Sequence, residues 1–212
     1  MRTDDLIKTL AIDAKRDAPS FSMLWWAGVV AAILVAAVVF FATLGMRPDF
    51  AQAAQTPRFV FKFVVTIALA ASAFFPARAL SRPDDAWRKA MPYLALAPIL
   101  IISAVLAELF LLPPNLWATR MIGTNSMVCL IYIPLIGIGP LGIFLTLLRH
   151  GASTRPTLAG AIAGVLAGAI AATLYAAQCT DDSPLFVATW YTIAISGLAA
   201  FGAIAANALA RW

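Results

Sequence analysis

Six long apolar runs dominate this sequence and limit the folds that it can adopt. Four of them carry no charge and reach the length of about 20 residues at which a helix crosses roughly 30 Å of hydrocarbon; they are residues 23–44, 121–148, 157–177 and 185–210. Two more, residues 59–77 and 90–112, each contain one charged residue, Lys62 and Glu108. Since no alternation of polar and apolar residues accompanies them, the sequence predicts an all-α integral membrane protein, a six-helix transmembrane bundle.

The basic residues predict the orientation of such a bundle across the membrane. On an alternating path, one side collects Arg2, Lys8, Lys15, Arg16, Arg78, Arg82, Arg88, Lys89, Arg149, Arg155 and Arg211, and the other side has Arg47, Arg58, Lys62 and Arg120. Because positive residues favour the cytoplasmic side, we expect both termini in the cytoplasm of a multi-pass bacterial inner-membrane protein. The same bias accounts for the net charge of +5 without a nucleic-acid partner.

The chain divides into a cytoplasmic N-terminal segment, residues 1–21, and a six-span transmembrane domain, residues 22–212. The segment contains four acids and no signal-length apolar run, so we expect it to remain as the tail of a membrane anchor. It reads as a short amphipathic helix that begins near Asp4 and Asp5, stops at Pro19, and carries an apolar stripe of Leu6, Ile7, Leu10, Ala11 and Ala14. That stripe could lie against the protein's own cytoplasmic turns or in the groove of a partner protein.

Glycines and prolines mark two of the spans. Gly160, Gly164 and Gly168 recur every fourth residue, a pattern typical of close helix packing, and we expect this face to pack inside the bundle rather than to form a dimer; the oligomeric state stays open. Pro134 and Pro140 lie in the fourth span, which should be kinked or partly unwound. Broken helices also occur in transporters, so a small membrane transporter or channel is the alternative function.

The sequence offers little for catalysis. Neither a paired-cysteine metal motif nor a phosphate-binding glycine loop nor a nucleophile signature is present, and the single histidine, His150, falls in a short turn. We therefore expect no enzymatic activity, no cofactor and no resident metal. In the membrane interior, Lys62 lies close enough to a span end to extend its ammonium to the surface.

The two cysteines fall on the same side of the predicted bundle. Cys129 is near the outer end of the fourth span, and Cys179 lies in the stretch QCTDDSP between the fifth and sixth spans. Three interpretations remain: unrelated cysteines, a structural or redox-responsive disulfide, and a soft-metal site that adds nearby carboxylates. Residues 182–184 also resemble an N-capping turn that starts the sixth helix.

Several stretches resemble one bacterial family over nearly the whole chain. The opening MRTDDLIKTLA, the run LLRHGASTRPTLAGAIAGVLAGAIAATLYAAQCTDDSPLFVATWY and the final ARW are similar to the NrsF family of membrane-bound negative regulators of sigma F. The resemblance implies an anti-sigma factor that holds an extracytoplasmic-function sigma factor at the inner membrane and releases it on stress.

The resemblance also implies roles for particular residues. The tail would contact the sigma factor, through Arg2, Asp4, Asp5, Leu6, Ile7, Leu10 and Ala11, and Cys129 and Cys179 would sense a periplasmic redox or metal stress. Membrane lipid would be the other partner. One position departs from the family pattern: a histidine often precedes the second cysteine, and here that residue is Gln178, which argues against the metal site and leaves the thiol interpretation intact.

Overall fold

The computed structural model describes residues 21–151 and 153–209, and every regular element in these ranges is a helix. Six helical segments are long and apolar enough to cross a membrane, as predicted. They are α2 (Phe21–Thr43), α4 (Pro57–Leu80), Ala86–Leu111, Pro114–Arg149, α9 (Pro156–Tyr175) and Pro184–Leu209. The amphipathic helix predicted in the N-terminal segment, which was expected to stop at Pro19, lies outside the described residues.

Three of these segments are composite. Ala86–Leu111 joins α5 (Ala86–Ala90), a 3₁₀ stretch (Met91–Ala95) and α6 (Leu96–Leu111). Pro114–Arg149 joins a 3₁₀ turn (Pro114–Leu116), α7 (Trp117–Ile122) and α8 (Ser126–Arg149), and Pro184–Leu209 joins α10 (Pro184–Phe186), a π-helical stretch (Val187–Tyr191) and α11 (Thr192–Leu209). A short helix, α3 (Phe50–Ala53), lies between α2 and α4.

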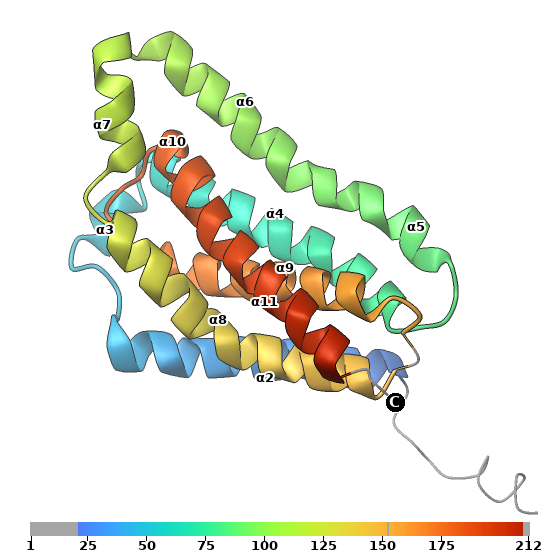
Figure 1. Cartoon of the computed structure of the whole chain (residues 1–212). Helices are drawn as coiled ribbons and strands as arrows, with labels where there is room; N and C mark the ends of the chain where they lie inside the picture. The colour runs from blue at the N-terminus through green and yellow to red at the C-terminus, as the bar shows by residue number, and fades with distance from the viewer. Residues whose placement is uncertain (1–20, 152, 210–212) are drawn as a thin grey trace, which may run out of the picture.

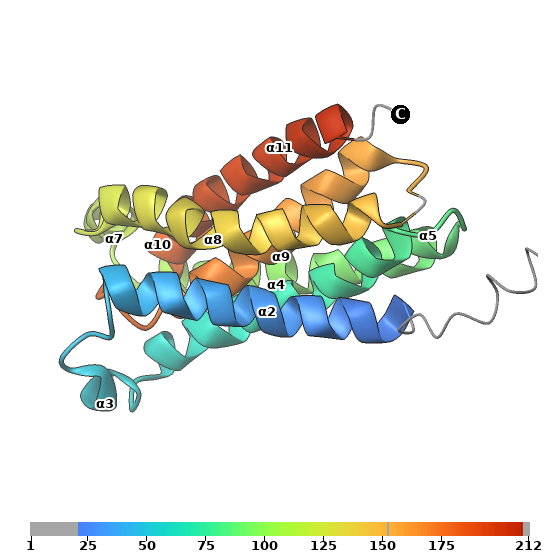
Figure 2. The same ribbon diagram turned by 90° about the horizontal axis from the view of Figure 1, so that it is seen from below.

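Helix α9 forms the centre of the bundle. It packs against α11, α4, α8 and α2, and it is the most buried of the six spans. Figure 2 shows α2 and α8 running alongside each other, and α6 follows the outer edge of the bundle in Figure 1, where it packs on α4. Alanine and glycine make up half of α9, so neighbouring helices can approach it closely on several sides.

The glycine face of α9 packs inside the bundle, as predicted. A Cβ atom added at Gly160 or Gly164 would collide with the backbone of α11, at Gly202 and Leu198 respectively. Gly168 faces Ile195, which is also on α11. The absence of side chains thus sets the distance between α9 and α11.

The fourth span differs from its prediction in two ways. The sequence predicted a kinked or partly unwound middle; helix α8 continues without interruption through Pro134 and Pro140, so the middle is not unwound. The break comes earlier, at Gly123, whose φ of 59° ends α7. That conformation is left-handed and favours glycine.

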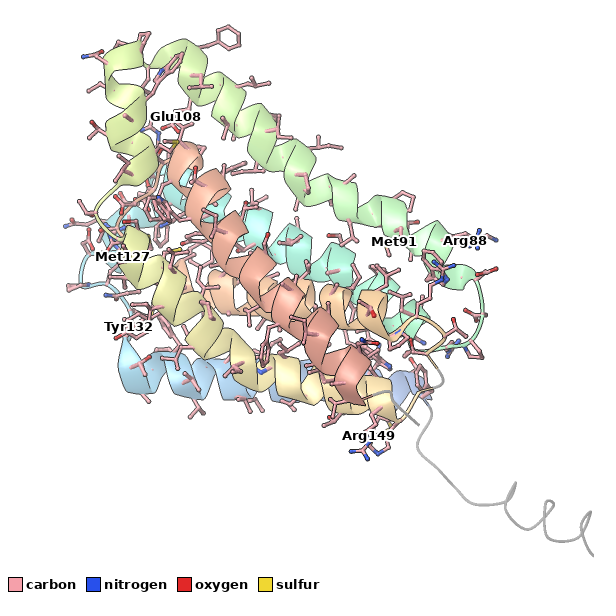
Figure 3. All side chains as sticks on the ribbon, viewed as in Figure 1. Arg88, Met91, Glu108, Met127, Tyr132 and Arg149 are labelled. Carbon is pink, nitrogen blue, oxygen red and sulfur yellow. The ribbon has the colours of Figure 1, made fainter. Side chains whose placement is uncertain are left out.

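Two ends of the bundle can now be distinguished. The Cys179 end carries α3, α7, α10 and the loop of residues 176–183, and the Arg149 end carries α5 and the end of α8. Figure 3 shows Glu108 and Met127 toward the first end and Arg88 and Arg149 at the second. Chain segments far apart in the sequence meet in the 176–183 loop.

Candidate functional site

A buried lysine anchors the loop of residues 176–183. Lys62 Nζ lies 2.5 Å from Asp182 Oδ1 and donates a hydrogen bond of 2.8 Å to the carbonyl oxygen of Cys179. The Lys62 side chain has no exposed surface, so the prediction that it extends to the membrane surface was wrong. An internal carboxylate and a carbonyl oxygen stabilise the ammonium where it lies.

An arginine from the segment after α2 reaches the same loop. Arg47 lies 3.4 Å from both Asp182 Oδ2 and the carbonyl oxygen of Cys179, and it forms two hydrogen bonds of 2.6 Å with Asp49. Its backbone N–H donates to the carbonyl oxygen of Ala177 at 3.2 Å. Hydrogen bonding to Arg47 lowers the pKa of Asp49, and the same bond raises the pKa of Arg47.

The second acid of the loop holds the start of α8. Asp181 Oδ2 accepts hydrogen bonds from the backbone N–H groups of Thr124 and Asn125, at 2.9 and 2.8 Å, and from Asn125 Nδ2 at 3.0 Å. An anion at a helix N-terminus is favoured by the helix dipole and by the unpaired N–H groups there. Asp181 therefore has a structural role that joins the loop to α8.

A third carboxylate stabilises the start of the sixth span. The helix begins at Pro184, as predicted, but no side chain of its own caps it. Instead, Glu108 Oε2 on α6 accepts hydrogen bonds from the Ser183 hydroxyl at 2.7 Å and the Leu185 N–H at 3.1 Å. The prediction that residues 182–184 cap this helix was thus wrong, because the capping carboxylate comes from another helix. Arg58 lies 3.8 Å from the Glu108 carboxylate.

Both cysteines lie beneath this polar network. Cys129 and Cys179 are free thiols with 0% and 1% exposure, they belong to one buried cluster, and they lie close enough to interact electrostatically. The Cys179 thiol donates a weak 3.7 Å hydrogen bond to the carbonyl oxygen of Asp181. Burial raises the pKa of Cys179, so its thiol is neutral near pH 7. The structure brings together the two cysteines that the sequence singled out.

A tyrosine also adjoins this pair. The Tyr191 hydroxyl is buried beside Cys179 and forms no hydrogen bond with a described residue. It lies in the π-helical stretch of the sixth span. Cys179 therefore lies beside the start of that span.

The nearby carboxylates already have partners. Asp182 pairs with Lys62 and Arg47, and Asp181 accepts hydrogen bonds from two backbone N–H groups. Within residues 21–151 and 153–209, no three His, Cys, Asp or Glu side chains are grouped as they would be around a metal ion. The carboxylates around the two thiols are thus engaged in contacts that hold the loop in place.

Comparison with known proteins places the chain in a family. Residues 10–212 match the family described as NrsF, negative regulator of sigma F. The chain belongs to the NrsF family. It is 32% identical over 221 residues to the anti-sigma-F factor NrsF of Caulobacter vibrioides (strain NA1000 / CB15N) and 31% identical over 218 residues to the probable anti-sigma-F factor NrsF of Azospira oryzae. Both matches cover 100% of each chain, and no solved structure matches significantly.

Some site residues of this NrsF-family chain escaped the sequence analysis. Lys62, Arg47 and Glu108 were counted as charges, but their contacts with the loop were not predicted. The available signal was the rarity of charge within an apolar span, which indicates a function or a partner. The tail residues predicted to bind the sigma factor, from Arg2 to Ala11, lie outside the described residues.

Proposed function

We propose that this chain is an anti-sigma factor of the bacterial inner membrane, with both termini in the cytoplasm and the Cys179 end in the periplasm. It would sequester an extracytoplasmic-function sigma factor and release it under periplasmic redox stress. The observation that carries the proposal is the full-length similarity to two proteins named as anti-sigma-F factors. The six apolar helices support the location in a membrane.

Sequestration would use the N-terminal segment. Leu6, Ile7, Leu10 and Ala11 would bury their side chains against the sigma factor, aided by Arg2, Asp4 and Asp5. A helix this short is marginal in water without a partner. Docking of its apolar stripe into a groove gives it one.

Release would begin at the cysteines. A disulfide-bearing oxidant would accept two electrons and two protons from Cys129 and Cys179, which would form a disulfide while the oxidant is reduced to two thiols. The new bond would tie α8 to the loop before α10. Since α8 runs from this site to Arg149 at the opposite end, a shift of this helix would reach the turn beside the sigma factor.

The docking segment is tested by capture of the cognate sigma factor on the detergent-solubilised protein. We expect a Leu6→Asp/Leu10→Asp variant to lose capture, because two charges on the stripe prevent its burial. The matched control, Thr9→Asp/Arg16→Gln, changes the net charge equally but leaves the stripe intact, and should capture normally. Equal capture by the Leu6→Asp/Leu10→Asp variant and wild type would rule out this docking segment.

The sensor is tested by transcription from a sigma-dependent promoter after exposure of cells to a disulfide-forming oxidant. A Cys129→Ser/Cys179→Ser strain should remain uninduced, while retaining sigma-factor capture. The serine hydroxyls preserve side-chain size but form no disulfide. Induction as strong as in wild type would remove the cysteines from the sensing mechanism.

A further inference from the structure

An apolar groove opens between α2 and α4. The two helices each pack on α9 but make few contacts with each other, and the space between them is about 350 Å³. Side chains of three helices line it: Trp26, Val29 and Ile33 of α2; Ile67, Ala70 and Phe75 among those of α4; and Leu166 and Ile170 among those of α9. A groove at this depth in the spans suits an acyl chain.

A basic pocket of about 390 Å³ adjoins this groove at the Arg149 end. It lies between the end of α4 and α5, and Phe75 lines both cavities. Arg78, Arg82 and Lys89 line the pocket together with one acid, Asp84. The acid is engaged in its own turn, where Asp84 Oδ1 accepts the Ala86 N–H at 3.2 Å.

The cations of this pocket are available to an anion. None of the three forms an ion pair with a described residue, unlike Arg88 nearby, which pairs with Asp85. The Arg82 guanidinium lies over the Phe21 ring, 5.0 Å from its centroid. Because Phe21 begins α2, Arg82 spans the gap between α4 and α2 at the end of the groove. The positive charge is therefore continuous with the apolar cavity.

We propose that the groove and the basic pocket together form a binding site for an anionic phospholipid. The phosphate would lie near Arg78, Arg82 and Lys89, and one acyl chain would follow the groove past Phe75 toward Ile33 and Ile67. Basic pockets between transmembrane helices recognise anionic headgroups in this way. A water-soluble protein could contact the basic pocket, but it would leave the apolar groove at membrane depth unfilled.

Lipid binding is measured by native mass spectrometry of the full-length, delipidated protein. Phosphatidylglycerol and phosphatidylcholine with identical acyl chains are titrated separately, and we expect phosphatidylglycerol to bind more tightly. An Arg78→Gln/Arg82→Gln variant should lower phosphatidylglycerol affinity by about 25-fold, since each basic residue near anionic lipid contributes about fivefold. The control Arg88→Gln/Arg149→Gln removes two cations from the same end but outside the pocket, and should bind as wild type does.

The acyl-chain half of the site has its own variant pair. Ala71 lines the groove and is exposed, so Ala71→Phe would fill the groove without displacing the core, and should weaken phosphatidylglycerol binding. Ala107 is an exposed alanine of α6 outside the groove, and Ala107→Phe should leave binding unchanged. Thermal unfolding of all four variants verifies that each is folded.

Four results would overturn the proposal. The first is equal affinity of wild type for the two lipids. The second is a loss of phosphatidylglycerol affinity in the Arg88→Gln/Arg149→Gln control as large as in the Arg78→Gln/Arg82→Gln variant. The third is displacement of the lipid by glycerol 1-phosphate at equal concentration, which would indicate a site for free phosphate. The fourth is an Arg78→Gln/Arg82→Gln variant that binds lipid normally but loses the sigma factor, because the pocket would then serve the protein partner. Since lipid binding is measured without the sigma factor, it stands or falls independently of the anti-sigma activity.

Discussion

Lys62 illustrates how a single charge can organise one end of a membrane bundle. Its ammonium is fully buried, yet it contacts the Asp182 carboxylate and the Cys179 carbonyl oxygen. Burial of a charge is unfavourable unless it is paired and hydrogen-bonded. The pairing therefore fixes where the 176–183 loop lies, and with it the position of the Cys179 thiol.

Loss of Lys62 should destabilise the protein. We expect Lys62→Met to lower the free energy of unfolding by roughly 2–3 kcal/mol, somewhat less than for a fully buried pair, because Asp182 is partly exposed and retains Arg47. Thermal or denaturant unfolding in detergent measures the change. In the Lys62→Met/Asp182→Asn double variant, the loss should be smaller than the sum of the single losses. Arg120→Gln, an exposed cation at the same end, is the control, and an equal effect there would contradict the pairing.

The Cys179 thiol should make stability depend on alkaline pH. Burial raises its folded-state pKa, whereas the unfolded thiol has a pKa of about 8.5. Below that value both states are protonated and the stability is fully present. As the pH rises above it toward the folded-state pKa, the unfolded state ionises first and stability falls. We expect the unfolding midpoint of wild type to decrease more between pH 7 and pH 10 than that of Cys179→Ser; parallel curves would contradict this.

At the scale of elements, the α9–α11 contact depends on missing side chains. Gly160 and Gly164 place the backbones of the two helices against each other. Alanine is normally the better helix former by about 1 kcal/mol. Here the steric conflict with α11 outweighs that preference, because backbone atoms cannot move aside as a flexible side chain can.

Gly164→Ala should therefore cost stability. We expect a loss of about 1–3 kcal/mol in the free energy of unfolding, as for other overpacked sites. Gly197 on α11 has open space around its added Cβ, so Gly197→Ala should be neutral or slightly stabilising. Both are measured by unfolding in the same detergent. If the two variants behaved alike, helix propensity rather than the α9–α11 contact would govern the glycines.

The elements also show what the sequence could reveal. All six spans were predictable, because the length of an apolar run relates directly to the membrane thickness. The glycine face was predictable as a packing surface, but its partner helix was not. The site was harder still: Lys62, Glu108 and Arg47 meet one loop through contacts that join residues far apart in the chain, and no local pattern encodes such contacts.

At the scale of the whole molecule, the two ends differ in how their charges are used. At the Cys179 end, Arg47, Arg58 and Lys62 each pair with a carboxylate, whereas Arg120 forms no ion pair with a described residue. At the Arg149 end, the described basic residues are Arg78, Arg82, Arg88, Lys89, Arg149 and Arg155. Of these six, only Arg88 forms an ion pair with a described residue. Unpaired positive charge thus lies mainly at the Arg149 end, which the proposed orientation places in the cytoplasm.

That orientation predicts which end is accessible from outside the cell. In a Cys129→Ser/Cys179→Ser background, exposed Arg120 of α7 and exposed Arg149 of α8 are each replaced by cysteine. A membrane-impermeant maleimide should label Arg120→Cys in intact spheroplasts, and label Arg149→Cys only after permeabilisation. Equal labelling of the two variants in detergent verifies that both thiols react.

The opposite labelling pattern would contradict the proposed mechanism. The Cys179 end would then face the cytoplasm, where thiols are kept reduced, and the start of α2, which follows the tail proposed to bind the sigma factor, would face away from that partner. The expected pattern places the thiols in an oxidising compartment and the tail beside its partner. A single labelling experiment thus tests the sensing and sequestering halves of the proposed function together, because one chain orientation must satisfy both.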